Sequence, residues 1–174
     1  MIKSFDFYFD FISPYSFLAH KEIIAIEKKN SIKIRYKPIL LGGLHNLHGI
    51  KPPAFIQAKA KHMVRDCKLI AEKNNIKFKF NSYFPIKSLN LMRGVLVADE
   101  DNYTSYYIDS IFNSIWRDGL NMNDETVIQK VLKNLNINPK TFLLRTSSSA
   151  IKDLLKKKTS EAYEKGVFFF STFI

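Results

Sequence analysis

The sequence contains very little cysteine, glycine and proline. Its 174 residues include a single cysteine, Cys67, with only six glycines and six prolines. One cysteine excludes an internal disulfide, a two-cysteine redox centre and a zinc site built from cysteines. The low glycine and proline content, beside 46% hydrophobic and 14% aromatic residues, excludes collagen-like, low-complexity and disordered chains. We therefore expect a folded globular protein with a sizeable core.

Long hydrophobic runs are also missing. The longest apolar stretches are far shorter than the roughly 20 residues that cross a bilayer, and Asp6 and Asp10 interrupt the region where a signal peptide would be continuous. We therefore expect a cytoplasmic protein with no membrane association. Cys67 falls in a row of helical spacing, which favours a core position over a reactive thiol. The row is Ile56, Ala60, Met63, Cys67 and Ile70.

The formal net charge is +11, and its positive part is concentrated in one segment. Residues 51–80 contain eight Lys or Arg against Asp66 and Glu72, whereas residues 81–130 are net acidic. This basic stripe of residues 51–80 could attract an organic anion or nucleic acid. The simpler alternative is a lysine-rich helix face in contact with water. We do not expect nucleic acid to be the main partner.

The N-terminal region shows a strand, a helix and a second strand. Residues 4–12 alternate strictly between apolar and polar side chains, which predicts a strand. Ser13 followed by Pro14 is a helix start signal, because a serine oxygen can cap free amide groups and proline is tolerated at the first helical position. We expect the helix over residues 14–29 and the second strand over residues 32–36, in a parallel, right-handed unit. The phenylalanines of the first strand share one face: Phe5, Phe7, Phe9 and Phe11.

The rest of the chain reads mostly as helix. Three glycines and two prolines predict a loop over residues 39–53. Gly166 stands where a helix should end, and residues 167–174 resemble the entry to a third strand. Between them we expect helices over residues 53–74, 87–99, 102–117, 124–135, 139–145 and 148–165.

Ser13 is the leading candidate for a functional residue. A serine at the N-terminus of a helix places its hydroxyl beside backbone amides and the positive end of the helix dipole. Such a position can stabilise an anion, and a bound thiolate there would have a lowered pKa. A serine that only caps its own helix explains the local sequence equally well.

Other chemistry is less well supported. His45 and His48 lie three residues apart, but no adjacent carboxylate or thiol completes a ligand set, so we expect no metal site. Nothing around Ser13 resembles the nucleophile elbow of a hydrolase.

Several segments, in order, resemble one family. Residues 7–19, Phe-Tyr-Phe-Asp-Phe-Ile-Ser-Pro-Tyr-Ser-Phe-Leu-Ala, are similar to the opening of 2-hydroxychromene-2-carboxylate isomerases and kappa-class glutathione transferases. In that opening Ser-Pro-Tyr replaces the Cys-Pro-Tyr of the related DSBA-like disulfide oxidoreductases. Further similarities follow at residues 40–43, 49–54, 59, 84–85, 92–93 and 166–168.

The resemblance implies an α/β fold, a thioredoxin-like sheet with a large helical insertion. Residues 1–41 and 166–174 would form the thioredoxin-like domain, and residues 42–165 the inserted helical domain with its connecting helix. It also implies glutathione as the cofactor, with Ser13 holding the thiolate and Lys59 pairing with a carboxylate of glutathione or substrate. The expected function is a glutathione-dependent isomerase of 2-hydroxychromene-2-carboxylate type that acts on a small aromatic or conjugated acid. A kappa-like glutathione transferase is the close alternative.

The sequence departs from the family pattern near the expected glutathione site. Ile50 stands where relatives have a glutathione-contacting asparagine, and Lys87 where an asparagine is frequent. Relatives read Gly-Val-Pro, with a cis proline, where this chain has Phe169, Phe170 and Ser171. Phe170 and Ser171 would therefore form the loop wall that faces the glutathione cysteinyl group. We expect a trans bond there, because a cis bond before serine costs about 2.5–4 kcal/mol.

The last strand and the final helix of the family fold have no counterpart in the sequence. Their loss would leave the third strand at a sheet edge and uncover an apolar sheet face. The consequence would be poor stability, a homodimer formed through that face, or a chain truncated relative to its functional ancestor, and we favour the last. An alternative function of a different class is a non-catalytic homologue that binds anions or a protein partner through the basic stripe.

Overall fold

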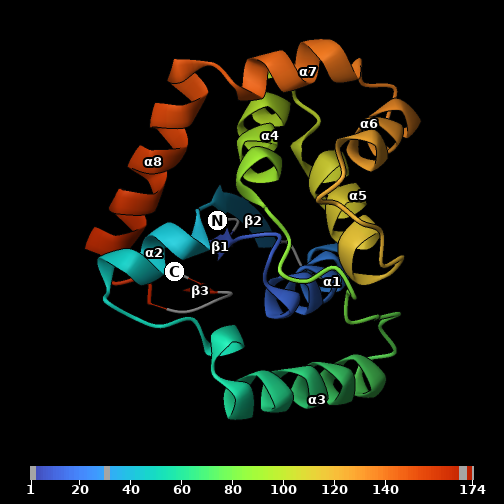
Figure 1. The fold of residues 1–174 in the computed structure, drawn as a ribbon, viewed down its shortest axis with the longest axis vertical. Helices are drawn as coiled ribbons and strands as arrows, with labels where there is room; N and C mark the ends of the chain where they lie inside the picture. The colour runs from blue at the N-terminus through green and yellow to red at the C-terminus, as the bar shows by residue number, and fades with distance from the viewer. Residues whose placement is uncertain (1–2, 30–31, 169–171, 174) are drawn as a thin grey trace.

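A computed structural model describes residues 3–29, 32–168 and 172–173, and Figure 1 shows how its elements are arranged. The strands are β1 Lys3–Phe9, β2 Ile32–Pro38 and β3 Thr172–Phe173, and a 3-10 turn, η1, spans Pro53–Phe55. The helices are α1 Pro14–Lys29, α2 Leu41–Leu47, α3 Gln57–Lys73, α4 Leu89–Glu100, α5 Thr104–Trp116, α6 Glu125–Asn134, α7 Pro139–Thr146 and α8 Ser149–Glu164.

The described sheet has the strand order β2-β1-β3. β1 pairs in parallel with β2, from Lys3 opposite Ile32 to Phe9 opposite Pro38, and α1 connects the two strands. β3 pairs antiparallel with β1. The sequence therefore predicted the strand, helix and parallel strand correctly. β1 ends at Phe9 rather than at residue 12, because the carbonyl of Asp10 already accepts the Ser13 N–H in the turn that leads into α1.

One face of β1 joins the sheet to the helices. Phe7, Phe9 and Phe11 are buried on this face, whereas Phe5, which the alternation placed with them, is 39% exposed. The ring of Phe112 in α5 lies 5.7 Å from that of Phe9 and 4.8 Å from that of Phe11, measured between centroids. Trp116 of α5 donates its indole N–H to the Phe11 carbonyl over 2.8 Å. Aromatic packing and a buried hydrogen bond thus hold α5 against the end of β1.

The structure corrects the prediction of a continuous loop over residues 39–53, because α2 occupies Leu41–Leu47. Leu41 and Leu44 are buried on one side of this short helix. The Leu41 N–H donates to the carboxylate of Asp10 over 2.8 Å, so a residue 31 positions earlier caps the helix. The glycines favoured a loop from local propensity, but packing and a distant cap outweigh that preference.

The helix expected over residues 53–74 is also divided in the structure. η1 is followed by Ile56 in an extended conformation, with φ of −113°, and α3 begins only at Gln57. The chain changes direction at this break, and α3 lies apart from α2, at the bottom of the view in Figure 1.

Helices α4 to α8 begin and end within two residues of the predicted ranges. Asp124 accepts the Thr126 N–H at the start of α6, and Asn138 accepts the Thr141 N–H at the start of α7. Gly166, with a positive φ of 73°, follows α8 as expected for a helix end. Figure 1 shows α4 at the centre of this helical part, with α5 and α6 to one side, α8 to the other and α7 above. The division into two domains at residues 41–42 and 165–166 stays a prediction.

Candidate active site

Ser13 lies in the turn between β1 and α1 and caps the helix. Its side-chain oxygen accepts the Ser16 N–H over 3.1 Å, and its carbonyl accepts the Phe17 N–H over 3.2 Å. Among the described residues, the Ser13 hydroxyl donates its own proton to no acceptor. Capping and binding an anion are therefore compatible, because the cap uses a lone pair and leaves the O–H donor available.

The buried carboxylate of Asp10 holds this turn in place through hydrogen bonds. It is only 2% exposed, and its two carboxylate oxygens accept the N–H groups of Ile12 over 3.1 Å and Leu41 over 2.8 Å. Burial raises the pKa of Asp10 above its usual value, while hydrogen bonds from Ser88, Leu41 and Ile12 act in the opposite direction. The carboxylate thus connects the Ser13 turn to the start of α2 and to the segment that leads into α4.

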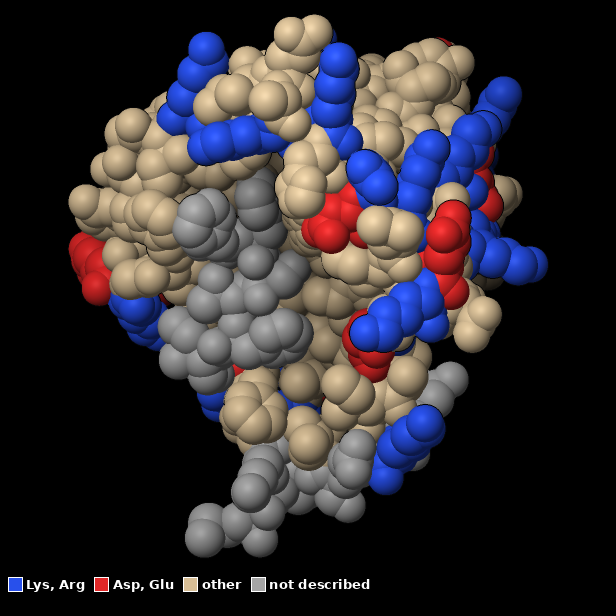
Figure 2. Space-filling model, turned by 90° about the horizontal axis from the view of Figure 1, so that it is seen from below, with Lys and Arg blue, Asp and Glu red and all other residues tan. Residues whose placement is uncertain are grey.

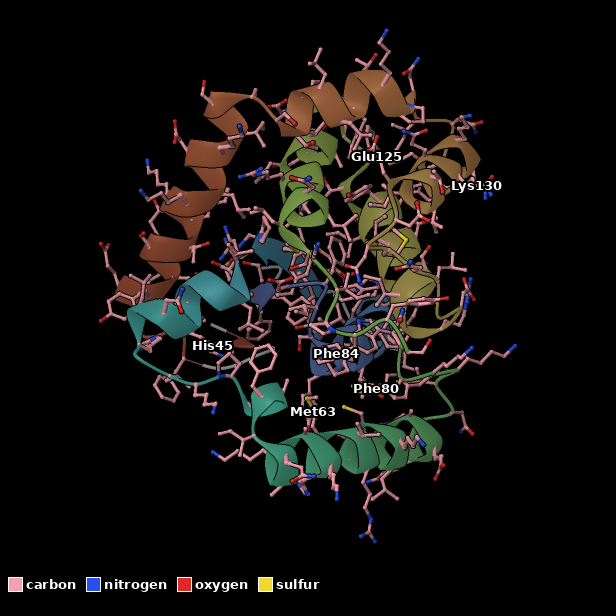
Figure 3. The ribbon with its side chains drawn as sticks, in the orientation of Figure 1. His45, Met63, Phe80, Phe84, Glu125 and Lys130 are labelled. Atoms are coloured by element: carbon pink, nitrogen blue, oxygen red, sulfur yellow. The ribbon has the colours of Figure 1, made fainter. Side chains whose placement is uncertain are left out.

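A small apolar cavity adjoins Ser13. Its volume is about 110 Å³, well below the roughly 300 Å³ at which pockets for drug-sized ligands begin, so it suits a group of side-chain size such as a cysteinyl thiol. Ser13 and His45 supply its polar side chains. Figure 3 shows His45, Met63 and Phe84 reaching this region from three separate segments. The other lining residues are Ile12, Pro14, Leu41, Gly42, Pro52, Pro53, Ala54, Phe55 and Pro85.

His45 is the second polar residue of the cavity and lies on α2, not in a loop. Its side chain is buried, and burial, with a smaller effect of nearby His48, lowers the pKa of His45 below its usual 6.5. The imidazole is therefore neutral at pH 7 and offers no positive charge. The electrostatic stabilisation of an anion would come instead from the Ser13 hydroxyl and the N-terminus of α1.

Of the other predicted site residues, the structure describes only Lys59. Lys59 is exposed on α3, one helical turn before Met63, and does not line the cavity. Phe170 and Ser171, and the trans bond expected before Ser171, lie outside the described residues and stay predictions.

The structure tests the predicted core position of Cys67. Cys67 is fully buried in α3, which confirms its predicted core position. Burial raises the pKa of its thiol to about 12, and the neighbouring Asp66 carboxylate acts in the same direction. Among the described residues, no three His, Cys, Asp or Glu side chains form a group that could hold a metal ion.

The basic stripe of residues 51–80 coincides in part with α3. Its exposed cations on this helix include Lys59, Lys61, Arg65 and Lys68. Figure 2 views the molecule from the α3 side, and blue side chains are densest on the right half of that face, with acidic side chains among them. The mixed charges are typical of a solvated helix face.

Sequence reasoning missed Asp10 and His45 as parts of the site. The alternation over residues 4–12 treats Asp10 only as a polar position of the first strand, although a carboxylate close before a helix start is a signal for a turn or cap. His45 could have been found from its position four residues after Leu41, a spacing that places both on one side of a helix. Phe84 and Pro85, joined by a cis peptide bond, also contribute to the cavity wall.

The arrangement defines a class of protein. A parallel strand-helix-strand unit with a Ser-Pro helix start, followed by a helical segment and a return strand on the other side of β1, is typical of thioredoxin-like proteins with an inserted helical region. Residues 4–168 match the family described as DSBA-like thioredoxin domain, and the chain belongs to that family.

Individual relatives make the resemblance more specific. The chain is 25% identical over 170 residues to a 2-hydroxychromene-2-carboxylate isomerase of Sphingobium xenophagum, covering 97% of this chain and 86% of the relative. Over 68 residues it is 40% identical to glutathione S-transferase kappa 1 of Caenorhabditis elegans, covering 38% of this chain and 30% of the relative. A solved structure of a 2-hydroxychromene-2-carboxylate isomerase superposes with a TM-score of 0.89 at 25% identity, covering 98% of this chain and 84% of that one. These comparisons confirm the family and the fold class predicted from the sequence.

The length and apolar character of the helices bear on whether any of them could span a membrane. Within the described ranges, none has the length and apolar character needed to cross a bilayer.

Proposed function

We propose that this protein is a glutathione-dependent isomerase of the 2-hydroxychromene-2-carboxylate type, in which Ser13 stabilises the glutathione thiolate. The observation that carries the proposal is the Ser13 hydroxyl, which adjoins a mostly apolar cavity and, among the described residues, donates its O–H to no acceptor while it caps α1. The similarity to a named isomerase over 97% of the chain supports the same reaction class.

The cavity fits the sulfur end of glutathione. When bound, glutathione would supply a thiolate that adds reversibly to a conjugated acid and so permits rotation about the former double bond. Ser13 would donate a hydrogen bond to the sulfur anion, and the N-terminus of α1 would add its positive field. The apolar walls exclude water, which strengthens both interactions.

Other residues position this site or extend it. Asp10 holds the Ser13 turn against α2, as its hydrogen bonds to Ile12 and Leu41 indicate. Lys59, exposed one turn before Met63, is proposed to pair with a carboxylate of glutathione or of the substrate. Phe170 and Ser171 are proposed to face the cysteinyl group from the segment before β3.

A comparison of two serine caps tests the role of Ser13. Ser148 caps α8 by accepting the Ile151 N–H, and it does not line the Ser13 cavity. Ser13→Ala and Ser148→Ala each remove a helix cap, which costs about 0.5–2 kcal/mol of stability. Only Ser13→Ala should weaken glutathione binding in calorimetry and raise the pKa of the bound thiol by about one to two units, since a hydrogen bond to a charged group contributes about 1.5–3 kcal/mol.

The same pair of variants can contradict the proposal. If Ser13→Ala and Ser148→Ala bind glutathione with the parent affinity and the same bound-thiol pKa, Ser13 acts only as a cap. Failure of the parent to bind glutathione at all would remove the cofactor from the proposal.

Turnover assays separate the isomerase from its alternatives. An isomerase converts 2-hydroxychromene-2-carboxylate only when glutathione is present and consumes none of it, whereas a transferase consumes glutathione with an electrophile. A non-catalytic protein would show neither activity, and salt-sensitive binding of nucleic acid would then indicate a role for the basic stripe.

A further inference from the structure

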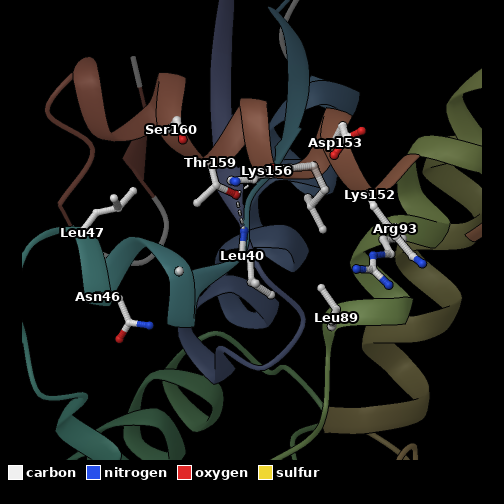
Figure 4. A pocket seen from close by; sticks show the side chains of 12 residues that line it. Leu40, Asn46, Leu47, Leu89, Arg93, Lys152, Asp153, Lys156, Thr159 and Ser160 are labelled. Carbon is white, nitrogen blue, oxygen red and sulfur yellow. Dashed lines mark hydrogen bonds between the residues drawn. The ribbon is translucent and has the colours of Figure 1, made fainter. Parts of the chain in front are cut away.

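A second hollow lies on the other side of α2 from Ser13. It has a volume of about 550 Å³ and is bounded by α2, α4 and α8, as Figure 4 shows. Leu41, Gly42 and His45 of α2 line the Ser13 cavity, whereas Gly43, Asn46 and Leu47 line this groove. The groove is therefore a separate space that shares only a helix with the candidate active site. Its volume falls within the roughly 300–1,000 Å³ of small-molecule sites.

The base of the groove is apolar and is held in place by a hydrogen bond. Leu40, Leu47, Leu89 and Leu155 contribute apolar side chains from three helices or their ends. The Leu40 N–H donates to the hydroxyl oxygen of the buried Thr159 over 3.0 Å, which fastens the start of α2 to α8. This bond is drawn in Figure 4. The groove is thus a preformed feature of the fold.

Cationic side chains also line the groove. Arg93 of α4 and Lys152 and Lys156 of α8 line the groove, and Asp153 is the acidic residue among the lining side chains. Lys152 and Lys156 are one turn apart and share a face of α8. In Figure 4, Arg93 and Lys152 occupy the end of the groove where Leu89 lies, and Asn46 and Leu47 occupy the opposite end.

These cations lack carboxylate partners in the described part of the chain. None of Arg93, Lys152 and Lys156 lies within 4.0 Å of an acidic oxygen there. Arg93 donates through Nη1 to Asn90 over 3.2 Å, but its Nε is buried without an acceptor among the same residues. A buried donor without an acceptor is unfavourable. The same guanidinium lines the groove, where an anion would pair with its charge.

We propose that this groove binds a small organic acid with an apolar body, with its carboxylate at Arg93 and Lys152 and its body along the leucines. An inorganic anion would leave the apolar base uncovered, and a neutral apolar compound would leave the Arg93 guanidinium without an anionic partner. The proposal does not depend on the function of Ser13, because the two sites lie on different sides of α2.

Naphthalene-2-carboxylate is a suitable probe, and its neutral amide is the matched control ligand. Calorimetric titration of the parent should show one saturable site for the acid, weaker binding of the amide, and weaker acid binding at higher salt. Arg93→Gln should weaken acid binding on the order of tenfold, as expected for loss of a charge-assisted hydrogen bond, and should leave amide binding unchanged.

A second groove variant and a control variant outside the groove complete the test. Lys152→Gln should weaken acid binding in the same direction even if Arg93→Gln folds poorly. Lys157→Gln, on the same helix but outside the groove, should bind the acid like the parent.

Absence of saturable binding, or equal affinities in the parent and in both groove variants, would overturn the proposal. So would loss of acid binding in Ser13→Ala, or its displacement by glutathione, because the probe would then occupy the Ser13 cavity.

Discussion

At the scale of single residues, two side chains that contain a possible nucleophile have opposite environments. The Ser13 hydroxyl adjoins a cavity at the start of α1, and its O–H meets no acceptor within the part of the chain that the structure describes. The Cys67 thiol is completely buried among core residues of α3. A thiolate is the reactive form of cysteine, and burial disfavours it. The only thiol of the chain is therefore excluded from chemistry at the candidate site, and a thiol would have to come from a ligand.

Cys67 should be unreactive toward Ellman's reagent in the native protein. With its pKa raised to about 12, its thiolate fraction at pH 8 is on the order of a thousandfold smaller than that of an ordinary cysteine. Leu69→Cys in the Cys67→Ala background places a thiol at an exposed position two residues later, and this control should react rapidly. In denaturant both proteins should react to one thiol per chain. Rapid reaction of native parent protein would contradict the buried placement.

At the scale of elements, close helix contacts hold the upper part of the molecule together. α4 packs against α5 and α7 at Gly94. The Tyr107 hydroxyl and the Phe142 ring occupy the space that a side chain at Gly94 would need. Tyr107 also donates to the Leu91 carbonyl over 3.0 Å, so that its ring cannot move freely. Glycine is required at this point by packing, not by an unusual backbone angle.

Gly94→Ala should therefore destabilise the protein. Overpacking costs about 1–3 kcal/mol, which exceeds the gain of about 1 kcal/mol that alanine offers in a helix. Gly42→Ala is the matched control, because it also lies in a helix but its added carbon would meet nothing within 4 Å. Denaturant unfolding should show a lower midpoint for Gly94→Ala and an equal or higher one for Gly42→Ala. Equal stability of both variants would argue against the close packing of α4.

At the scale of the whole molecule, a polar network joins the strand-helix-strand unit to the helical part. His20 of α1 contacts the Tyr36 hydroxyl of β2 over 2.9 Å through Nδ1 and the Asp109 carboxylate of α5 over 3.1 Å through Nε2. Lys21 pairs with the same carboxylate over 2.6 Å. Burial lowers the pKa of His20, although Asp109 acts against this effect. The assigned arrangement is a neutral imidazole that accepts from Tyr36 and donates to Asp109.

This network should make the protein less stable in acid. Because the pKa of His20 is lower in the folded state, the unfolded chain gains a proton first as the pH falls below about 6.5. Hydrogen bonds from His20 and Lys21 lower the pKa of Asp109, so its stabilising effect is lost as the pH falls below about 4. The unfolding free energy should therefore decrease from pH 7 to 5, and again below pH 4.

His20→Gln should reduce the slope between pH 7 and 5 without removing it, because burial lowers the pKa of His45 as well. His62→Gln is the control, because it also removes one histidine but at an exposed position of α3. Denaturant unfolding at several pH values measures the slope. A slope in His20→Gln equal to that of the parent would contradict the role assigned to His20.

The sequence by itself determined the elements whose signals are local. Alternation predicted β1, although not where it ends, and Ser13 and Pro14 predicted the start of α1. The predicted ranges of α6 and α7 begin within one residue of the observed helices. Each of these signals acts within a few residues. The helical row around Cys67 likewise predicted its burial. The ordered motifs were sufficient to indicate the family.

Only the tertiary structure decided the features that combine distant segments. α2 forms because Asp10 caps it from 31 residues away, and no local propensity carries that information. The Ser13 cavity needs walls from α2, η1, α3 and the Phe84–Pro85 segment, and the cationic groove needs α2, α4 and α8. Hydrogen bonds and side-chain packing between residues far apart in sequence depend on the folded path of the chain, which periodicity and caps do not specify.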